Sequence, residues 1–470
     1  MKTVCRFAKL VPATCVLLAA ISVPSQQPPN APSAAQLPGV PGRVLTITPE
    51  AGFNNEPSIA VNAANSSQLI AAYQMPARVA YSQDGGNSWK LATGTEPKDY
   101  RISGDVSVTY DKHGTAILCY IAFDKLGTEN YWAHSATRNG IFVRRSMDGG
   151  ATWEAQAHAV IEQPTKPGIP FEDKPYIAAD NTSSKHAGNL YIGWTEFRIN
   201  ESVILFSRST DGGQTWSAPI IISTHHGLPR DDNGAVEGWS SAVAADGTLY
   251  SVWADGDAIA FATSHDGGKT FSRSRNVIAT APLYFAVAGL DRANGFPQLA
   301  IDARHGRKGL LYLTWSDYRD GDIGVYCATS DDGGKTWSKP VRVNSNAAHD
   351  GTDQFFQWLA VDPVSGAASV IFYDRRCDPD NRKTTVTLAR STDGGKTFSN
   401  YAWTRDAFVP RRDDFLGDYI GIAALNNKVL GVWAEIAPPS TPKDQTVPAT
   451  NRKPQTNVRA GIADFSKDSR

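Results

Sequence analysis

The sequence predicts an all-β fold, a seven-bladed β-propeller of four-stranded antiparallel sheets. Three observations lead to this prediction: an octet that recurs six times, pairs of short strands ahead of the octets, and the length of the folded segment. The octets begin at serines separated by 64, 63, 55, 66 and 61 residues, a spacing typical of a repeat architecture. The segment from Arg43 to Phe465 holds about seven units of that length. The octets begin at Ser82, Ser146, Ser209, Ser264, Ser330 and Ser391.

Each of the first six repeats contains four predicted strands. A short apolar strand comes first, a strand rich in Trp, Tyr and Phe comes second, a third strand leads into the octet, and a fourth follows it. Short strands with turn signals at this spacing indicate an all-β assembly. The first and second strands are predicted at 57–62 with 69–74, 106–111 with 116–124, 174–180 with 190–197, 240–246 with 249–255, 297–302 with 311–317, 357–362 with 369–374, and 418–425 with 428–436.

The seventh repeat has no octet and only three strands of its own, the last at 458–465. A strand at 43–49 precedes the first repeat and is predicted to be the fourth strand of the last blade. Pairing the two ends of the chain closes the ring and removes sheet edges that would otherwise pair with other molecules.

The first 25 residues differ from the rest of the chain. Lys2, Arg6 and Lys9 come before the apolar run 10–23, a pattern that predicts a secretory signal at 1–25 and a secreted or periplasmic protein. Residues 26–42 are a proline-rich linker, and residues 43–470 are expected to form a single propeller domain.

The charge balance excludes several classes of partner. Lys and Arg total 46 and Asp and Glu total 47, so the chain has no overall field to hold nucleic acid or an anionic membrane surface. No segment after the signal is long and apolar enough to span a membrane. His225 and His226 have no recognisable third ligand, so we expect no catalytic metal and no cofactor. A closed ring has no exposed sheet edge that another subunit must cover, so we expect a monomer.

Three cysteines remain outside the signal: Cys119, Cys327 and Cys377. An odd number in so long a chain is not a disulfide framework. Two alternatives stay open, a single Cys327–Cys377 disulfide or buried free thiols.

The residue types of the octet have structural roles. Its Asp can accept hydrogen bonds from backbone N–H groups, its paired glycines allow positive φ, and its hydroxyl adds a turn contact. The Trp or Phe that closes the octet can be buried between neighbouring sheets. A catalytic residue is not needed six times, so the octets are predicted to be structural turns.

The octet Ser-x-Asp-Gly-Gly-x-Thr-Trp resembles the Asp-box, or BNR repeat, of the sialidase-like (neuraminidase) superfamily of β-propellers, and its six copies cover the chain from Ser82 to Phe398. The resemblance implies that the octets lie between the third and fourth strands, away from the active-site face. That superfamily includes sialidases, other glycosidases, lyases and non-enzymatic binding propellers. Its sialidases carry a Phe/Tyr-Arg-Ile-Pro motif at the first blade, which is missing here because residues 53–61 read FNNEPSIAV.

Propeller topology places the candidate site opposite the octets. Loops that lead into the innermost strands and loops that leave the second strands emerge together around the central channel, where a ligand is expected to bind. Crowded carboxylates there would keep one member protonated as the acid of a glycoside hydrolase. The candidate catalytic residues are Asp173, Glu172, Glu237, Asp374 and Tyr419.

Arginines, aromatic residues and further acids on the same face are candidates for substrate binding. Arginines can hold the carboxylate of an acidic sugar in a bidentate manner, and indole rings can stack on sugars. The alternative for Asp317 with Arg319, and for Asp374 with Arg376, is that they simply pair with each other. The substrate-binding candidates are Arg198, Arg319, Arg375, Arg376, Trp239, Trp132, Glu56 and Asp105.

These residues predict an exported glycoside hydrolase of the sialidase-like type, acting on glycans that include sialic acid or other acidic sugars. A propeller that binds carbohydrate or protein without chemistry is the alternative from another class, and a polysaccharide lyase is a third.

Overall fold

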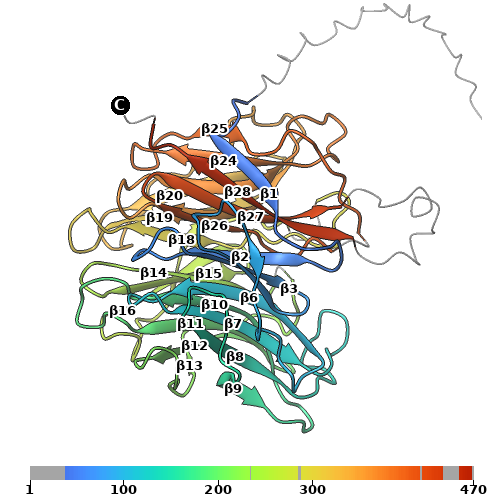
Figure 1. Cartoon of the computed structure of the whole chain (residues 1–470), viewed down its shortest axis with the longest axis vertical. Helices are drawn as coiled ribbons and strands as arrows, with labels where there is room; N and C mark the ends of the chain where they lie inside the picture. Colours follow the sequence, from blue (N-terminus) through green and yellow to red (C-terminus); the bar gives the residue numbers. More distant parts are fainter. Residues whose placement is uncertain (1–36, 233, 284–286, 413–414, 438–454, 468–470) are drawn as a thin grey trace, which may run out of the picture. The chain divides into compact units, whose positions relative to one another are not determined.

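The computed structural model describes residues 37–232, 234–283, 287–412, 415–437 and 455–467, and these residues form strands and no helix. The predicted signal, 1–25, lies outside the described residues. The strands assemble into seven four-stranded antiparallel sheets, so the predicted fold class is confirmed (Figure 1). No helix in the described part of the chain could span a membrane.

In blades 1 to 3 the chain runs from the innermost strand outward. Their strands are β2 (Asn55–Val61), β3 (Leu69–Gln74), β4 (Arg78–Ser82), β5 (Lys90–Leu91), β6 (Ile102–Tyr110), β7 (Ala116–Phe123), β8 (Asn139–Ser146), β9 (His158–Gln163), β10 (Phe171–Ala179), β11 (Leu190–Phe197), β12 (Ser202–Ser209) and β13 (Ile220–Ile221).

Blades 4 to 6 repeat the same order. Their strands are β14 (Val236–Val243), β15 (Leu249–Asp255), β16 (Ala258–Ser264), β17 (Arg275–Ala279), β18 (Gln298–Asp302), β19 (Leu310–Asp317), β20 (Gly324–Ser330), β21 (Val341–Arg342), β22 (Gln354–Val361), β23 (Ala368–Asp374), β24 (Thr385–Ser391) and β25 (Ser399–Ala402).

Blade 7 combines both ends of the described chain. It contains β26 (Gly421–Leu425), β27 (Lys428–Ile436), β28 (Thr456–Asp464) and β1 (Gly42–Thr46). Strand β1 pairs with β28 in an antiparallel register that sets Val44 opposite Gly461.

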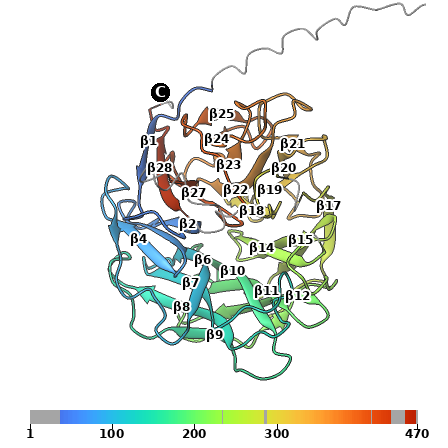
Figure 2. The same cartoon turned by 90° about the vertical axis from the view of Figure 1, so that its right-hand side faces the viewer.

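The innermost strands contact one another in order around the channel, and β26 contacts β2. Figure 2 shows β2, β6, β10, β14, β18 and β22 toward the middle of the ring, with β9, β12, β17 and β25 toward its outside. The segments that lead into these innermost strands therefore meet around the channel.

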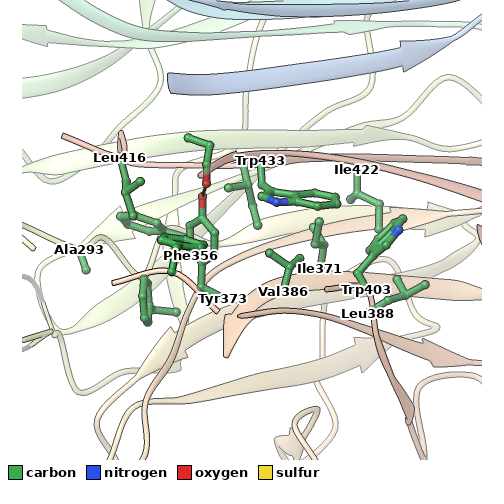
Figure 3. Close-up of a cluster of buried hydrophobic side chains, with 14 of the residues drawn as sticks. Ala293, Phe356, Ile371, Tyr373, Val386, Leu388, Trp403, Leu416, Ile422 and Trp433 are labelled. Atoms are coloured by element: carbon green, nitrogen blue, oxygen red, sulfur yellow. Dashed lines mark hydrogen bonds between the residues drawn. The ribbon is translucent and has the colours of Figure 1, made fainter. Parts of the chain in front are cut away.

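Apolar side chains fill the spaces between neighbouring blades. Between blades 6 and 7, Trp403 and Trp433 lie with ring centroids 5.6 Å apart among aliphatic residues (Figure 3). In the same cluster the hydroxyl of Tyr373 donates to the carbonyl of Ala434 at 2.5 Å. Burial of each large side chain is worth about 1.5–3 kcal/mol, so these layers hold the blades together.

The octets are turns between the third and fourth strands. In the first octet, Asp84 accepts hydrogen bonds from the backbone and hydroxyl of Ser88, at 2.9 and 2.6 Å, and from the hydroxyl of Ser82 at 2.8 Å. The hydrogen bond from the Ser88 side chain lowers the pKa of Asp84 to about 2. Every acceptor of the Asp is engaged within its own turn, as the structural interpretation requires.

All three described cysteines are free thiols. Cys119 and Cys327 are buried, and Cys377 is exposed. The predicted alternative of a Cys327–Cys377 disulfide is therefore wrong, because Cys327 is enclosed in β20 whereas Cys377 lies in the loop after β23.

Candidate functional site

The innermost strands are irregular where they begin. In five blades the register between the first and second strands shifts at a bulge, which turns one residue out of the regular ladder. Four of these residues are not glycine although their φ is positive, a conformation that costs about 1–3 kcal/mol each and that clusters at functional sites. The bulge residues are Glu56 (48°), Asp105 (45°), Lys174 (49°), Gly238 (70°) and Phe356 (52°).

Lys174 lies at the centre of a buried cluster of charged groups. Its Nζ is 3.2 Å from Asp173 Oδ2, 3.4 Å from Asp231 Oδ1 and 3.3 Å from Asp418 Oδ2. Burial opposes a charge on Lys174, but the three carboxylates outweigh burial and hold its pKa well above the usual value. Lys174 is therefore a permanent cation that neutralises part of this acidic site.

Arg292 is the second cation of the cluster. Its guanidinium binds Asp418 in a bidentate manner, with Nε 2.7 Å from Oδ1 and Nη2 2.6 Å from Oδ2, and its Nη1 is 2.8 Å from Asp231. Arg292 and Asp231 belong to long loops before β18 and β14, whereas Asp418 precedes β26. The cluster thus ties three separate segments to Lys174 at the start of blade 3.

Three carboxyl groups from blades 1, 2 and 3, those of Glu56, Asp105 and Asp173, lie close enough to shift one another's pKa. The side-chain carboxyl of Asp105 interacts with those of Glu56 and Asp173, and it also accepts a hydrogen bond from the backbone N–H of Lys174 at 3.1 Å. Burial, followed by the charge of a neighbouring acid, raises the pKa of Glu56 to about 8 and of Asp105 to about 7; burial also raises that of Asp173 well above its usual value. Asp105 keeps partial exposure, while Glu56 and Asp173 are buried. Protonated and ionised carboxyls therefore lie side by side near neutral pH, within reach of solvent.

Glu237 extends the acidic cluster into blade 4. It is buried, and neither of its carboxylate oxygens has a hydrogen-bond partner in the described part of the chain. Burial is the main cause that raises its pKa well above the usual value, and the charge of Asp231 adds to it. Glu237 lines a small cavity with Asn294, between blades 4 and 5.

Four of the predicted site residues, Glu56, Asp105, Asp173 and Glu237, thus belong to one cluster with Lys174. Tyr419 lies beside this cluster, since the charges of Glu56 and Asp105 act on its hydroxyl. Its ring packs against Tyr176 and Trp358, with centroids 5.5 and 5.6 Å apart, and its hydroxyl donates to the carbonyl of Val106 at 3.5 Å. Burial raises the pKa of Tyr419 well above the usual value, so its hydroxyl is not an ionised nucleophile.

The structure gives Glu172 and Asp374 partners outside the cluster. Glu172 accepts hydrogen bonds from Trp194 Nε1 at 2.6 Å and from Gln163 Nε2 at 2.8 Å. Asp374 pairs with Arg376 at 2.6 Å. Both acids hold strands in place, and neither is retained as a candidate acid or base.

Two of the predicted arginines, Arg198 and Arg319, are paired with carboxylates of the protein. Arg198 binds Glu196 at 2.6 Å and Glu201 at 2.7 Å. Arg319 binds Asp317, as the alternative interpretation held. Its guanidinium also lies over the aromatic rings of Trp315 and Tyr326.

The neighbouring pair Arg375 and Arg376 is engaged as well. Arg376 binds Asp374, again as the alternative held. Arg375 is buried and donates to the carbonyls of Ala288 and Asn381 at 2.8 Å; burial lowers its pKa to about 10. The four arginines are therefore parts of separate structural contacts.

The two predicted sugar-stacking tryptophans are packed against protein. Trp239 is 1% exposed and packs against Phe206, and a Cβ on Gly193 would lie 2.2 Å from its indole. This ring has no face left for a sugar, which corrects its assignment. Trp132 is partly buried and packs on the core between blades 2 and 3.

Sequence reasoning did not select Asp231, Arg292, Asn294, Lys174 or Asp418. The first three belong to long loops, where only the polar runs at 230–232 and 291–294 mark them. The other two lie beside selected residues but were not chosen. Within the described ranges, no group of three or more His, Cys, Asp or Glu residues is placed to hold a metal ion.

Seven four-stranded blades with Ser-x-Asp-Gly-Gly turns define an Asp-box β-propeller, and they are consistent with the sialidase-like superfamily. The BNR/Asp-box repeat family matches residues 207–218 and 328–339. No curated protein matches the sequence.

Several solved structures are similar to this chain. An ulvan lyase of the polysaccharide lyase family PL25 is 11% identical, with 88% of this chain and 95% of that chain covered and a TM-score of 0.50. An α-L-arabinofuranosidase from Fusarium graminearum is 16% identical over 79% and 96% of the two chains, with a TM-score of 0.48. A Hadza microbial sialidase is 15% identical over 86% and 75%, with a TM-score of 0.46. At these identities the likeness shows the fold alone.

Proposed function

We propose that this protein is an exported glycoside hydrolase of the sialidase-like type that acts on glycans through the acidic cluster at the channel. The observation that carries the proposal is the group of three interacting carboxyls in which Asp105, partly exposed, lies beside Glu56 and Asp173. The apolar segment at 10–23, with its basic residues, supports export.

Glycoside hydrolysis needs one protonated and one ionised carboxyl group. The raised pKa values leave a proton on the carboxyls of Glu56, Asp105 and Asp173 near neutral pH. That proton can pass to the glycosidic oxygen as the bond between this oxygen and the sugar breaks. Asp105, with a pKa of about 7, is partly ionised near neutral pH and can attack the sugar or activate water, while the ammonium of Lys174, 3.2 Å from Asp173, opposes part of the effect of burial on the pKa of Asp173. Acid and base thus have distinct environments within one site.

The test compares two neighbouring buried acids of the same strand. Asp173→Asn should lower hydrolysis of chromogenic glycosides by about 10²–10⁴-fold, as should Asp105→Asn, because each variant removes one of the three interacting carboxyls. Glu172→Gln is the matched control: its pKa is also raised by burial, but its hydrogen bonds go to Trp194 and Gln163. It should keep activity within a few-fold.

The substrate panel should include neutral, amino and acidic glycosides, with sialosides among them. Circular dichroism and thermal unfolding of each variant would confirm that the fold is retained. If the wild-type protein turns over no member of the panel, the hydrolase proposal fails and a propeller that only binds glycans takes its place. N-terminal sequencing of the product recovered outside the cytoplasm would test export.

A further inference from the structure

A small cavity between blades 4 and 5 is lined by two buried polar side chains without partners. Glu237 is 2% exposed and Asn294 is 3% exposed. Both oxygens of Glu237 and both amide atoms of Asn294 have no hydrogen-bond partner among the described residues. Leaving a buried polar group unpaired costs about 1–3 kcal/mol, so such groups are rare in native proteins. Two of them lining one cavity indicate a site for a ligand.

The cavity has room for a substituent and not for a whole sugar ring. It holds about 50 Å³ of space for water-sized groups. Its apolar wall includes Leu283, Phe296 and Ile259, and Asp232 lies with Glu237 among its polar residues. A group that enters must therefore be small and must supply hydrogen-bond donors to Glu237.

The charges around the cavity favour a cation. Of the described residues that line it, none is Lys or Arg. The nearby cations Lys174 and Arg292 are bound to the carboxylates of Asp173, Asp231 and Asp418. A carboxylate ligand would be repelled here, whereas a cation would relieve the cost of a buried, unpaired Glu237.

An ammonium group matches the unpaired atoms in number. It donates three hydrogen bonds, and the two side chains that line the cavity carry three acceptors without partners among the described residues: Oε1 and Oε2 of Glu237 and Oδ1 of Asn294. Nδ2 of Asn294 remains to donate to a hydroxyl oxygen. A hydroxyl next to an amino group is the arrangement of a 2-amino sugar.

We propose that this cavity binds the protonated amino group of an amino sugar, with Glu237 and Asn294 as its partners. The choice of a sugar as the ligand rests on the proposed glycoside hydrolase activity. The proposal names the substrate class of that same site at the channel. The raised pKa of Glu237 supports it, since binding of the ammonium would release the proton that Glu237 otherwise holds.

The experiment measures binding by isothermal titration calorimetry at mildly acidic pH, with D-glucosamine, N-acetyl-D-glucosamine and D-glucuronate. D-glucosamine should bind at least tenfold more tightly than either comparator, and its binding heat should depend on the ionisation enthalpy of the buffer because a proton is released. Glu237→Gln and Asn294→Ala should each weaken that binding at least tenfold. Glu172→Gln, a buried acid outside the cavity, should leave it unchanged.

Equal binding of the amine and its acetylated form, no binding of D-glucosamine, or undiminished binding by Glu237→Gln would each overturn the amino-sugar site. Should Glu237→Gln fail to fold, Asn294→Ala decides by the same measure. Preferred binding of D-glucosamine without turnover of any glycoside would uphold the site and reject the hydrolase. Turnover of a glycoside without preferred binding of D-glucosamine would uphold the hydrolase and reject the amino-sugar site.

Discussion

Lys174 shows how one residue depends on its neighbours. A lysine that is 3% exposed is stable as a cation only because Asp173, Asp231 and Asp418 surround its ammonium. Lys174 also has a φ of 49°, a strained backbone conformation for a residue other than glycine. Removing one partner of a buried ion pair costs far more than the pair contributes, because the other charge stays buried without compensation.

Lys174→Met is expected to lower the free energy of unfolding by about 3–5 kcal/mol at neutral pH, because three buried carboxylates lose their shared cation. Urea denaturation measures this loss. The exposed Lys269→Met is the control, and equal stability of the two variants would contradict the ion cluster.

At the scale of the element, the octet joins its blade to the preceding one. Its second glycine packs against the neighbouring sheet with a positive φ that favours glycine. In the fifth octet, Gly334 has φ of +80°, and a Cβ there would lie 2.2 Å from Cζ of Phe261, a buried ring of blade 4. The turn is thus fitted to its neighbour both in conformation and in space.

Gly334→Ala separates these two requirements when it is compared with Gly306→Ala. Both positions have positive φ, but a Cβ at Gly306 meets nothing within 4 Å. Gly306→Ala should cost about 1–2 kcal/mol from backbone strain alone. Gly334→Ala should cost about 1–3 kcal/mol more, because the buried ring of Phe261 must shift. Equal losses of stability in urea would show that the octet is not packed against blade 4.

Elements that repeat could be predicted from sequence, and elements that do not repeat could not. The strand pairs and octets recur at a nearly constant interval, so their period predicted the blades, and the strand ends predicted that Glu56, Asp105, Asp173 and Glu237 would meet. Arg292 escaped prediction because it belongs to a long loop whose path no periodic pattern encodes. The structural contacts of the arginines and of Trp239 could not be predicted, because polar and aromatic types at strand ends serve contacts between strands and blades as well as binding.

For the whole molecule, two sets of carboxyl groups respond to pH in opposite directions. Hydrogen bonds from Ser88 lower the pKa of Asp84 to about 2, and those from Thr397 outweigh the effect of burial to give about 2 for Asp393. At the channel, burial raises the pKa of Glu56 to about 8 and that of Asp105 to about 7. The octets thus favour the ionised state and the channel favours the protonated state.

These shifts predict that stability is greatest at mildly acidic pH. Octet carboxyls, with pKa values depressed by folding, contribute stability that is present above about pH 4 and is lost as the pH falls toward 2. Channel carboxyls have raised values, so their contribution is complete below about pH 4 and is lost as the pH rises through 7 to 8. Calorimetric Tm should therefore peak at about pH 4 to 5 and fall by several degrees toward pH 9.

The variant Glu56→Gln assigns the alkaline limb of that profile. Because it removes the group whose pKa is raised to about 8, the fall of Tm between pH 6 and 9 should become shallower, while the acid limb below pH 4 stays as in the wild type. Asp84→Asn should act on the acid limb alone. A wild-type Tm that is constant from pH 5 to 9, or an alkaline limb that Glu56→Gln leaves unchanged, would show that the channel carboxyls are ionised at neutral pH and would remove the acid from the proposed hydrolase.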